Sequence, residues 1–136
     1  MTTITLKSLL TTSADSVTAN TSLKDAVQAL ISARLPALPV INENRELVGL
    51  IRQQDCHHAM LNSSYYCDEP LRVEDVMQTD FRQLALNEQA ADIAIQTAKL
   101  AQDIFPVVEG GTMIGIVTRL DILAFLNDNL SLCQQG

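Results

Sequence analysis

The run Asp55-Cys56-His57-His58 places an acid, a thiol and two imidazoles in four consecutive positions. Such side chains bind zinc or act as nucleophile and base in catalysis. Adjacent residues of a helix do not face each other, however, and a two-ligand helical site such as HExxH needs i, i+4 spacing, which this run lacks. We therefore interpret the run as structural, with Cys56 as a small buried hydrophobic side chain, and keep metal binding and redox sensing as alternatives.

The acid of this run stands at a position that recurs later in the chain. Residues 49–55 read GLIRQQD and residues 115–121 read GIVTRLD, so the glycine and the aspartate both repeat after 66 residues. Pro39 and Pro106 lie 67 residues apart. The difference of one residue falls in a predicted hairpin turn, where changes in length are tolerated. The chain therefore contains an internal repeat, in which the thiol and imidazoles are replaced by Ile-Leu-Ala.

Both halves predict the same series of elements to position these motifs. An apolar stripe from Leu23 to Ile31 at helical spacing predicts a helix over 22–31, with Ser22 and Asp25 as a capping pair. The other predicted elements are strands over 37–41 and 47–51 and a helix over 53–61, then a helix over 89–101, strands over 104–108 and 113–117 and a helix over 120–130. Each half is too small to cover its own sheet, which predicts two units packed sheet to sheet.

The repeat also divides the chain. We predict a first unit over 1–61, a polar connector over 62–72 and a second unit over 73–136, with apolar lead-ins at 6–10 and 73–77. Tyr65 and Tyr66 of the connector are interpreted as covering the edge of the core, and stacking on a ligand is the alternative.

Composition excludes several classes of partner. The chain has 136 residues, 47% of them hydrophobic, and a net charge of −7 without a basic run. This charge disfavours both nucleic acid and anionic lipid. Three widely spaced cysteines, no signal-peptide pattern and no long apolar run predict a cytoplasmic protein without a membrane span. The apolar excess indicates a surface that contacts another copy or a partner.

Two copies of a helix, an ALPV-type strand, a hairpin and a GxxTxxD-type motif that opens a helix resemble a tandem pair of cystathionine-β-synthase (CBS) domains, a Bateman module. The resemblance extends from about Leu6 to Leu126. It implies an α+β fold of two β-α-β-β-α units packed sheet to sheet around a pseudo-twofold axis. It also implies a regulatory module without an active site, whose two clefts between the units hold AMP, ADP, ATP or S-adenosylmethionine.

The resemblance assigns roles in the cleft of the later motif, here called the second cleft. Asp121 is implied to accept hydrogen bonds from ribose hydroxyls, and Thr118 to contact phosphate or sugar. This is sound chemistry, because an ionised carboxylate only accepts and a helix start favours an anion. The remaining implied lining residues are Leu35, Pro36 and Ala37 against the adenine, Ile116 in the same pocket, and Arg119 for phosphate if its side chain turns inward.

The first cleft, around Asp55, departs from the family pattern. Arg52 replaces the hydroxyl residue, and the opposite wall carries Asp103 and Ile104. We expect Arg52 to pair with Asp103 and fill the cleft. The sequence therefore predicts that the second cleft binds ligand and that the first is weak or empty.

Two alternatives to this sensor remain. Asp55 and Asp121 could be plain helix N-caps, and Thr118 an ordinary strand residue. The whole chain could be a dimerisation or protein-interaction module without a ligand. No catalytic set is recognised, so we expect no enzyme, no metal and no required cofactor. The resemblance implies a homodimer whose output is read by an effector in another chain.

Overall fold

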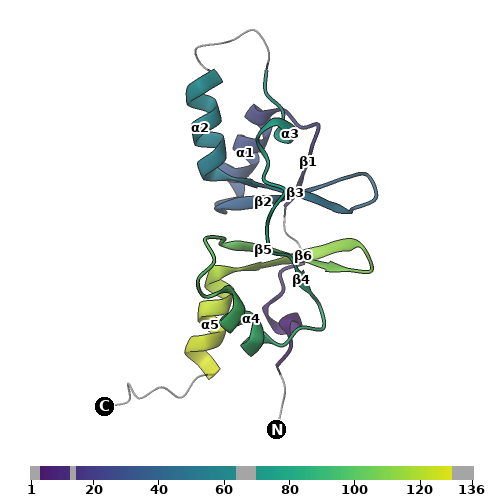
Figure 1. Cartoon of the computed structure of the whole chain (residues 1–136), viewed down its shortest axis with the longest axis vertical. Helices are drawn as coiled ribbons and strands as arrows, with labels where there is room; N and C mark the ends of the chain where they lie inside the picture. The colour runs from purple at the N-terminus through teal and green to yellow at the C-terminus, as the bar shows by residue number, and fades with distance from the viewer. Residues whose placement is uncertain (1–3, 13–14, 64–69, 130–136) are drawn as a thin grey trace, which may run out of the picture.

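The computed structural model describes residues 4–12, 15–63 and 70–129. The first unit contains β1 (Val17–Thr18), α1 (Leu23–Ala33), β2 (Ala37–Ile41), β3 (Leu47–Arg52) and α2 (Gln53–Ser63). The second contains β4 (Leu84–Ala85), α4 (Ala90–Thr97), β5 (Ile104–Glu109), β6 (Thr112–Thr118) and α5 (Arg119–Asn129). A 3-10 helix, η1 (Leu6–Leu9), and a short helix, α3 (Val73–Val76), precede them. The predicted β-α-β-β-α order is confirmed in both units (Figure 1).

The two sheets repeat each other in register as well as in order. In each, a short first strand pairs in parallel with the second, which pairs antiparallel with the third. Pro39 pairs with Leu50, and Pro106 pairs with Ile116. The register shifts at Val40/Ile41 in one sheet and at Val107/Val108 in the other, which are equivalent positions of the repeat. The equivalent pairs Ile41–Leu47 and Val108–Met113 enclose five and four residues, so the one-residue difference between the halves falls in the hairpin turn, as predicted.

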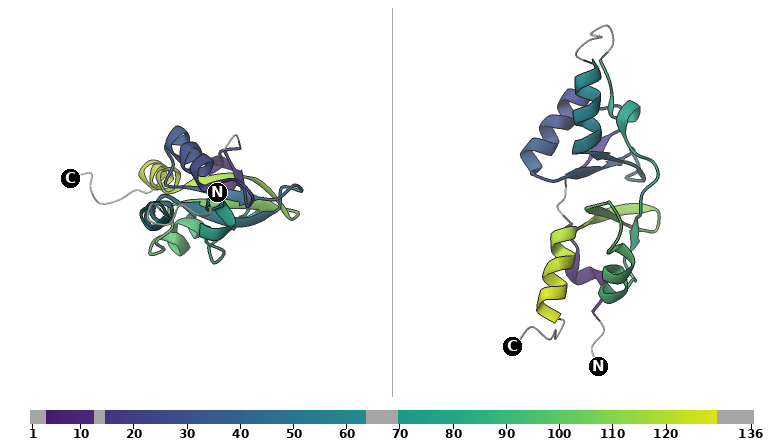
Figure 2. Two further views of the ribbon diagram at one scale, coloured as in Figure 1. Left: turned by 90° about the horizontal axis from the view of Figure 1, so that it is seen from above. Right: turned by 60° about the vertical axis from the view of Figure 1, so that its left-hand side comes forward.

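The sheets face each other, and the helices lie on the outer sides of both (Figures 1 and 2). Ala37 and Leu50 of the first sheet form one buried cluster with Ile104 and Ile116 of the second. This apolar contact removes from water the sheet faces that neither unit covers with its own helices. Packing of the units sheet to sheet is therefore confirmed.

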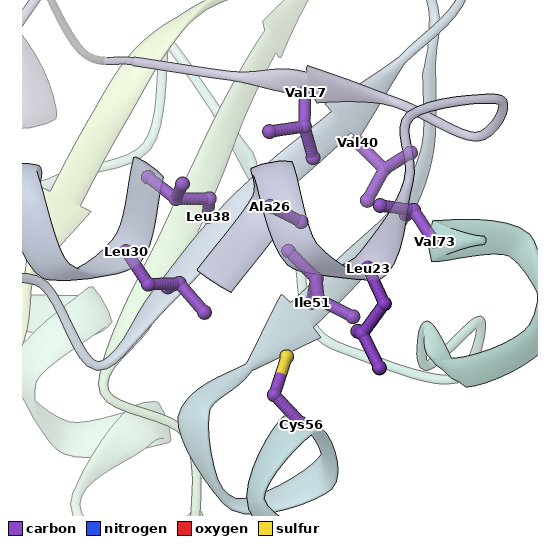
Figure 3. Packing of buried hydrophobic residues seen from close by; sticks show 9 residues of the cluster. All are labelled: Val17, Leu23, Ala26, Leu30, Leu38, Val40, Ile51, Cys56 and Val73. Carbon is purple, nitrogen blue, oxygen red and sulfur yellow. The ribbon is translucent and has the colours of Figure 1, made fainter. Parts of the chain in front are cut away.

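Behind its sheet, each unit has a helical core. Figure 3 shows that of the first unit, where Leu23, Ala26 and Leu30 of α1 pack toward the sheet. The start of α1 follows the sequence prediction, because the Ser22 hydroxyl accepts a hydrogen bond from the Asp25 N–H at 3.1 Å. Cys56 of α2 joins this core and is only 3% exposed, so its predicted structural role is confirmed.

The lead-ins pack on the opposite unit from the one they precede. Leu6 of η1 lies in the core of the second unit, and its N–H donates to the Glu88 carbonyl at 2.9 Å. Val73 of α3 lies in the core of the first unit, and its N–H donates to the Thr21 carbonyl at 2.8 Å. Figure 1 shows the same exchange, with α3 beside β1 in the first unit. The unit boundaries 1–61 and 73–136 remain a prediction from the sequence, because each lead-in packs in the core of the other unit.

Gly49 and Gly115 allow the exchanged lead-ins to cross the sheets. A Cβ on Gly115 would overlap the backbone carbonyl of Thr11, which pairs with Ile116. A Cβ on Gly49 would lie 2.6 Å from the Met77 sulfur. The repeated glycines therefore mark close backbone approach rather than a turn.

One predicted helix is longer than the observed one. Helix α4 ends at Thr97, whereas the apolar pattern predicts a helix to residue 101, and Ala101 is exposed. The Thr97 hydroxyl donates back to the Ile93 carbonyl at 2.7 Å, and the Leu100 N–H turns to the Thr97 carbonyl. Arg119 donates to the same Thr97 carbonyl and to the Leu100 carbonyl, which stabilises the irregular ending.

Candidate ligand-binding site

The second motif forms a reciprocal pair at the start of α5. The Thr118 N–H donates to Asp121 Oδ2 at 2.8 Å, and the Asp121 N–H donates to Thr118 Oγ1 at 3.1 Å. This is the geometry of a capping box, in which Thr118 is the N-cap residue and Asp121 the third residue of the helix, so Asp121 supports the cap but is not the N-cap that the alternative named. Within the described residues Asp121 Oδ1 has no hydrogen-bond or ion-pair partner. The half-buried carboxylate is thus held in place by one oxygen and offers the other.

The first motif is built differently. Arg52 binds Asp55 through two parallel bonds, Nε to Oδ2 at 2.7 Å and one terminal nitrogen to Oδ1 at 2.9 Å. The pKa of Arg52 is raised, mainly by this hydrogen bonding and against the effect of burial. The prediction that Arg52 pairs with Asp103 is therefore wrong. Asp55 lies three residues away in sequence and presents both oxygens to the planar guanidinium.

Arg119 does not turn toward the motif that contains it. Its guanidinium donates to the carbonyls of Thr97, Leu100 and Gln102 beyond the end of α4, and lies 5.6 Å from the centre of the Phe105 ring. Its Nε also lies 3.3 Å from Asp103 Oδ1. These partners stabilise the loop before β5, so the phosphate role predicted for Arg119 has no support in this arrangement.

A cavity of about 440 Å³ lies at the first motif. Arg52 and Asp103 line it, as the sequence predicts for the first cleft, whereas Asp55 does not. Pro36 and Ala37, which were expected beside Asp121, line this cavity instead. The other lining residues are Leu50, Gln53, Gln54, His57, Ala101 and Gln102. The cavity is large enough for a small molecule but has an acid on one wall.

The apolar residues predicted for the clefts meet between the sheets. Leu35 packs on the cluster that contains Ile116 and Ile104, both almost fully buried. Because this cluster also contains Ala37 and Leu50, Leu35 and Ile116 share one apolar cluster between the two sheets. Ile104 contributes to this shared core and is not among the residues that line the cavity at the first motif.

The Asp-Cys-His-His run does not converge on a single site. Cys56 is buried, and burial together with the charge of Asp55 raises the pKa of its thiol to about 11. His57 and His58 are exposed, and His58 Nε2 lies 3.1 Å from the Asn62 amide. Among the described residues no three His, Cys, Asp or Glu side chains gather as a metal site. Tyr65, Tyr66, Cys67 and Cys133 lie outside the described residues.

Two residues that hold or precede the loop between α1 and β2 were missed by sequence reasoning. Gln53 fixes the loop after α1, donating its backbone N–H to the Pro36 carbonyl at 2.9 Å and its side-chain amide to the Leu35 carbonyl at 2.8 Å. Arg34 ends α1 with a left-handed backbone, φ 55°, and its side chain is exposed. The signal for Arg34 was its place between a predicted helix and a predicted strand, where such a cap is common.

Comparison with solved structures shows that other proteins share this fold. The chain resembles the crystal structure of a putative acetoin utilization protein from Vibrio cholerae, with a TM-score of 0.82, 24% identity and coverage of 99% of this chain and 98% of that one. It also resembles CBSX2, a CBS-pair protein of Arabidopsis thaliana, with a TM-score of 0.79, 23% identity and coverage of 93% and 96%. A CBSX2 structure solved in complex with AMP gives a TM-score of 0.78 at 24% identity, covering 92% and 97%. None of the helices in the described parts of the chain is long and apolar enough to cross a membrane.

Parts of curated protein sequences are also similar to this chain. The chain is 36% identical over 110 residues to the A-adding tRNA nucleotidyltransferase of Aquifex aeolicus, and 30% identical over 111 residues to a homoserine O-acetyltransferase of Methanobrevibacter ruminantium. These matches cover 80% and 81% of this chain but only 13% and 21% of the relatives, so the chain spans a small part of their length. The family model of the CBS domain matches residues 6–62 and again residues 73–128. The chain therefore belongs to the CBS domain family, as a tandem pair of its domains.

Proposed function

We propose that this CBS pair is a regulatory module that binds an adenosine-containing ligand, AMP, ADP, ATP or S-adenosylmethionine, at the second cleft. The observation that carries the proposal is the Asp121 carboxylate, which Thr118 holds through one oxygen while the other has no partner among the described residues. Two vicinal ribose hydroxyls are donors that suit such an acceptor. The AMP complex of CBSX2, a protein of the same fold, supports this class of ligand.

The same comparison within the chain supports an asymmetry between the clefts. Both oxygens of Asp55 are taken by Arg52 at 2.7 and 2.9 Å, so a ribose would have to displace a bidentate ion pair. The cavity beside it has the volume for a nucleoside, but Asp103 adds a negative charge to its wall. We therefore propose that the second cleft binds and that the first is weak.

The clustered chemistry of residues 55–58 supports binding rather than catalysis. The Cys56 thiol is buried and its raised pKa keeps it protonated at neutral pH, which disfavours a nucleophile. The two imidazoles are exposed on α2 and share no catalytic partner among the described residues.

A ligand that favours one arrangement of the two units would change the surface that a partner contacts.

A second candidate is a homodimerisation or interaction module without a ligand. Large apolar side chains are exposed on all four outer helices: Ile31 on α1 at 62%, Met60 and Leu61 on α2 at 44% and 60%, Ile95 on α4 at 75%, and Leu120 and Leu123 on α5 at 75% and 51%. Single exposed apolar residues are ordinary, but several on the outer helices favour a contact with another copy. We propose a homodimer in either case, with the output read by another chain.

Calorimetric titration of nucleotide-free protein with the four ligands tests the proposal. Asp121→Ala and Asp55→Ala form a matched pair, because both remove an acid three residues after the end of the third strand of its sheet. We expect Asp121→Ala to abolish binding of whichever compound binds, and Asp55→Ala to change its affinity less than twofold. Equal losses would contradict the asymmetry. Flat isotherms for all four compounds would leave the interaction module, to be measured by sedimentation of the wild-type protein.

A further inference from the structure

The turn between β2 and β3 is built around an arginine with a left-handed backbone. Asn42 organises this turn, because its side-chain oxygen accepts the N–H groups of Asn44 and Glu46, both at 2.9 Å. The Arg45 N–H donates to the Asn42 carbonyl at 3.0 Å, and the φ of Arg45 is 60°. Glycine adopts this conformation at lower cost, and the equivalent turn of the second unit has glycines at its left-handed positions, 110–111. The fold of a unit therefore does not require an arginine here.

In this conformation Arg45 contacts the second unit. Its carbonyl accepts a hydrogen bond from the Met113 N–H of β6 at 2.9 Å, and its guanidinium donates to the Met113 carbonyl at 3.5 Å. Met113 is 1% exposed, so its N–H would be buried and unpaired without this partner. One residue of the first unit thus pairs both main-chain groups of a buried residue of the second.

The contact has no counterpart in the opposite direction. Leu47 is equivalent to Met113, since each pairs with the residue that follows the register shift of its sheet. Within the described residues, no hydrogen bond joins the second turn, residues 109–112, to Leu47 or to any other residue of the first unit. In the same part of the chain, the Arg45–Met113 contact is the only hydrogen-bonded contact between the units apart from the bonds of residues 4–12 and 70–78, which contain the lead-ins.

This contact lies at the end of the sheets opposite the first motif. Strand β2 runs from Ala37, which pairs with Arg52, to Ile41 at the turn. The cavity of about 440 Å³ lies at the Ala37 end, between Arg52 of the first unit and Asp103 of the second. Figure 1 shows both hairpins projecting on one side of the molecule, with α2 and α5 on the other. The units are thus tied by hydrogen bonds at the hairpin end, whereas a cavity lies between them at the motif end.

We infer that the Arg45–Met113 contact is the hinge between the two units. It holds the hairpin ends of the sheets together, so a change in the angle between the units opens or closes the motif end. The inter-sheet cluster permits such a rotation, because apolar contacts have no preferred direction, unlike hydrogen bonds. The inference goes beyond the proposed function and does not depend on it, because it concerns how the units move and not what they bind.

Amide hydrogen exchange, followed by NMR on the full-length chain, tests the contact. Arg45→Gly permits a φ of 60° and keeps the carbonyl, whereas Arg45→Val opposes this conformation, which a β-branched residue rarely adopts. The readout is the exchange rate of the Met113 N–H divided by that of the Ile116 N–H, which donates to the Thr11 carbonyl instead. We expect Arg45→Val to raise this ratio about tenfold and Arg45→Gly to change it less than twofold.

A transplanted turn repeats this test without a strained residue. Replacing residues 42–46 with Glu-Gly-Gly-Thr, the sequence of residues 109–112, removes Arg45 and supplies a turn that the second unit already forms. The ratio should rise as it does in Arg45→Val. An unchanged ratio in both variants, or a Met113 N–H without protection in the wild type, would refute the contact and the hinge with it.

Two pairs of spin labels test the hinge itself, in a chain with Cys67 and Cys133 replaced by serine and Cys56 left buried. Gln54→Cys with Ala101→Cys places exposed labels on the two sides of the cavity, and Glu43→Cys with Glu109→Cys places them on the two turns. We expect a narrower distance distribution for the turn pair than for the cavity pair, and Arg45→Val should broaden the turn pair alone.

The widths of these distributions decide between a hinge and a rigid or uniformly loose interface. Equal widths for the two pairs, or a broader distribution for the turn pair, would refute the hinge even if the Met113 N–H is protected. A turn pair that Arg45→Val leaves unchanged would show that the contact does not restrain the units. None of these measurements uses a ligand, so a failure here leaves the proposed adenosine site untouched.

Discussion

Replacing Arg119 with alanine should destabilise the protein by about 3 kcal/mol. The side chain donates to the carbonyls of Thr97 and Gln102. The Thr97 carbonyl keeps the Leu100 N–H at 3.1 Å, so the bond to Gln102 dominates and contributes about 1.5–3 kcal/mol, as a charged donor does where water cannot replace it. The Leu100 carbonyl is exposed and should regain water, so its bond adds little. Stacking on the buried Phe105 ring adds about 0.5–1 kcal/mol.

The ion pair with Asp103 should contribute almost none of this. The Asp103 side chain is 58% exposed and the atoms are 3.3 Å apart, which is the geometry of a weak surface pair worth about 0–1 kcal/mol. Asp103→Asn is therefore expected to cost less than about 0.5 kcal/mol. Arg119→Lys should recover less than half of the loss, because an ammonium cannot span three carbonyls and also stack on a ring.

Urea unfolding followed by circular dichroism measures these differences, with Arg34→Gln as the control that removes an arginine without a partner among the described residues. In thermal unfolding the loss in Arg119→Ala corresponds to about 10 °C for a chain of this length. A loss below about 0.5 kcal/mol in Arg119→Ala would show that the carbonyls are satisfied by water just as well. If Asp103→Asn lost as much free energy of unfolding as Arg119→Ala, the ion pair and not the bonds to the carbonyls would provide the stabilisation.

Two further predictions concern the core. Gly115→Ala should lower the free energy of unfolding by about 1–3 kcal/mol, because the new Cβ meets the backbone of Thr11. Gly49→Ala should lower it less, because the Met77 side chain can move away from the new Cβ. Equal urea midpoints for the two variants would contradict this difference. The Cys56 thiol should resist a thiol reagent at pH 8 in native protein with Cys67 and Cys133 replaced by serine, and react on unfolding. Because folding raises its pKa from 9.0 to about 11, the folded state holds the proton more tightly, so this contribution to stability is complete below pH 9 and is lost as the pH rises to 11. Rapid reaction of the native thiol at pH 8, or a flat stability profile between pH 9 and 11 relative to Cys56→Ala, would disprove the burial argument.

The repeat made most of the fold predictable. A strand over 37–41, the turn that absorbs the one-residue difference and the burial of Cys56 all follow from aligning one half with the other. Alignment could not show the exchange of the lead-ins, because Leu6 and Val73 present the same apolar pattern to either core. A short apolar segment specifies that it must be buried but not against which sheet.

Side-chain partners of the arginines were the least predictable part of the site. Arg52 pairs with Asp55, three residues away, and not with Asp103. Arg119 donates to backbone carbonyls and not to the motif that contains it. A long flexible side chain reaches many acceptors, so its partner depends on local geometry that spacing does not encode. The Thr118–Asp121 pair was not predicted, although a hydroxyl residue three positions before an acid at a helix start is the signature of a capping box.

The exchanged lead-ins also bear on how this chain can be divided. A half-length chain would carry a lead-in whose core residue, Leu6 or Val73, belongs to the other half, and would lack the one that completes its own core. Two half-length chains could repair each other only by trading those segments. In topological terms the molecule corresponds to a segment-swapped dimer with its two subunits joined end to end, so each half lacks a segment that completes its own core.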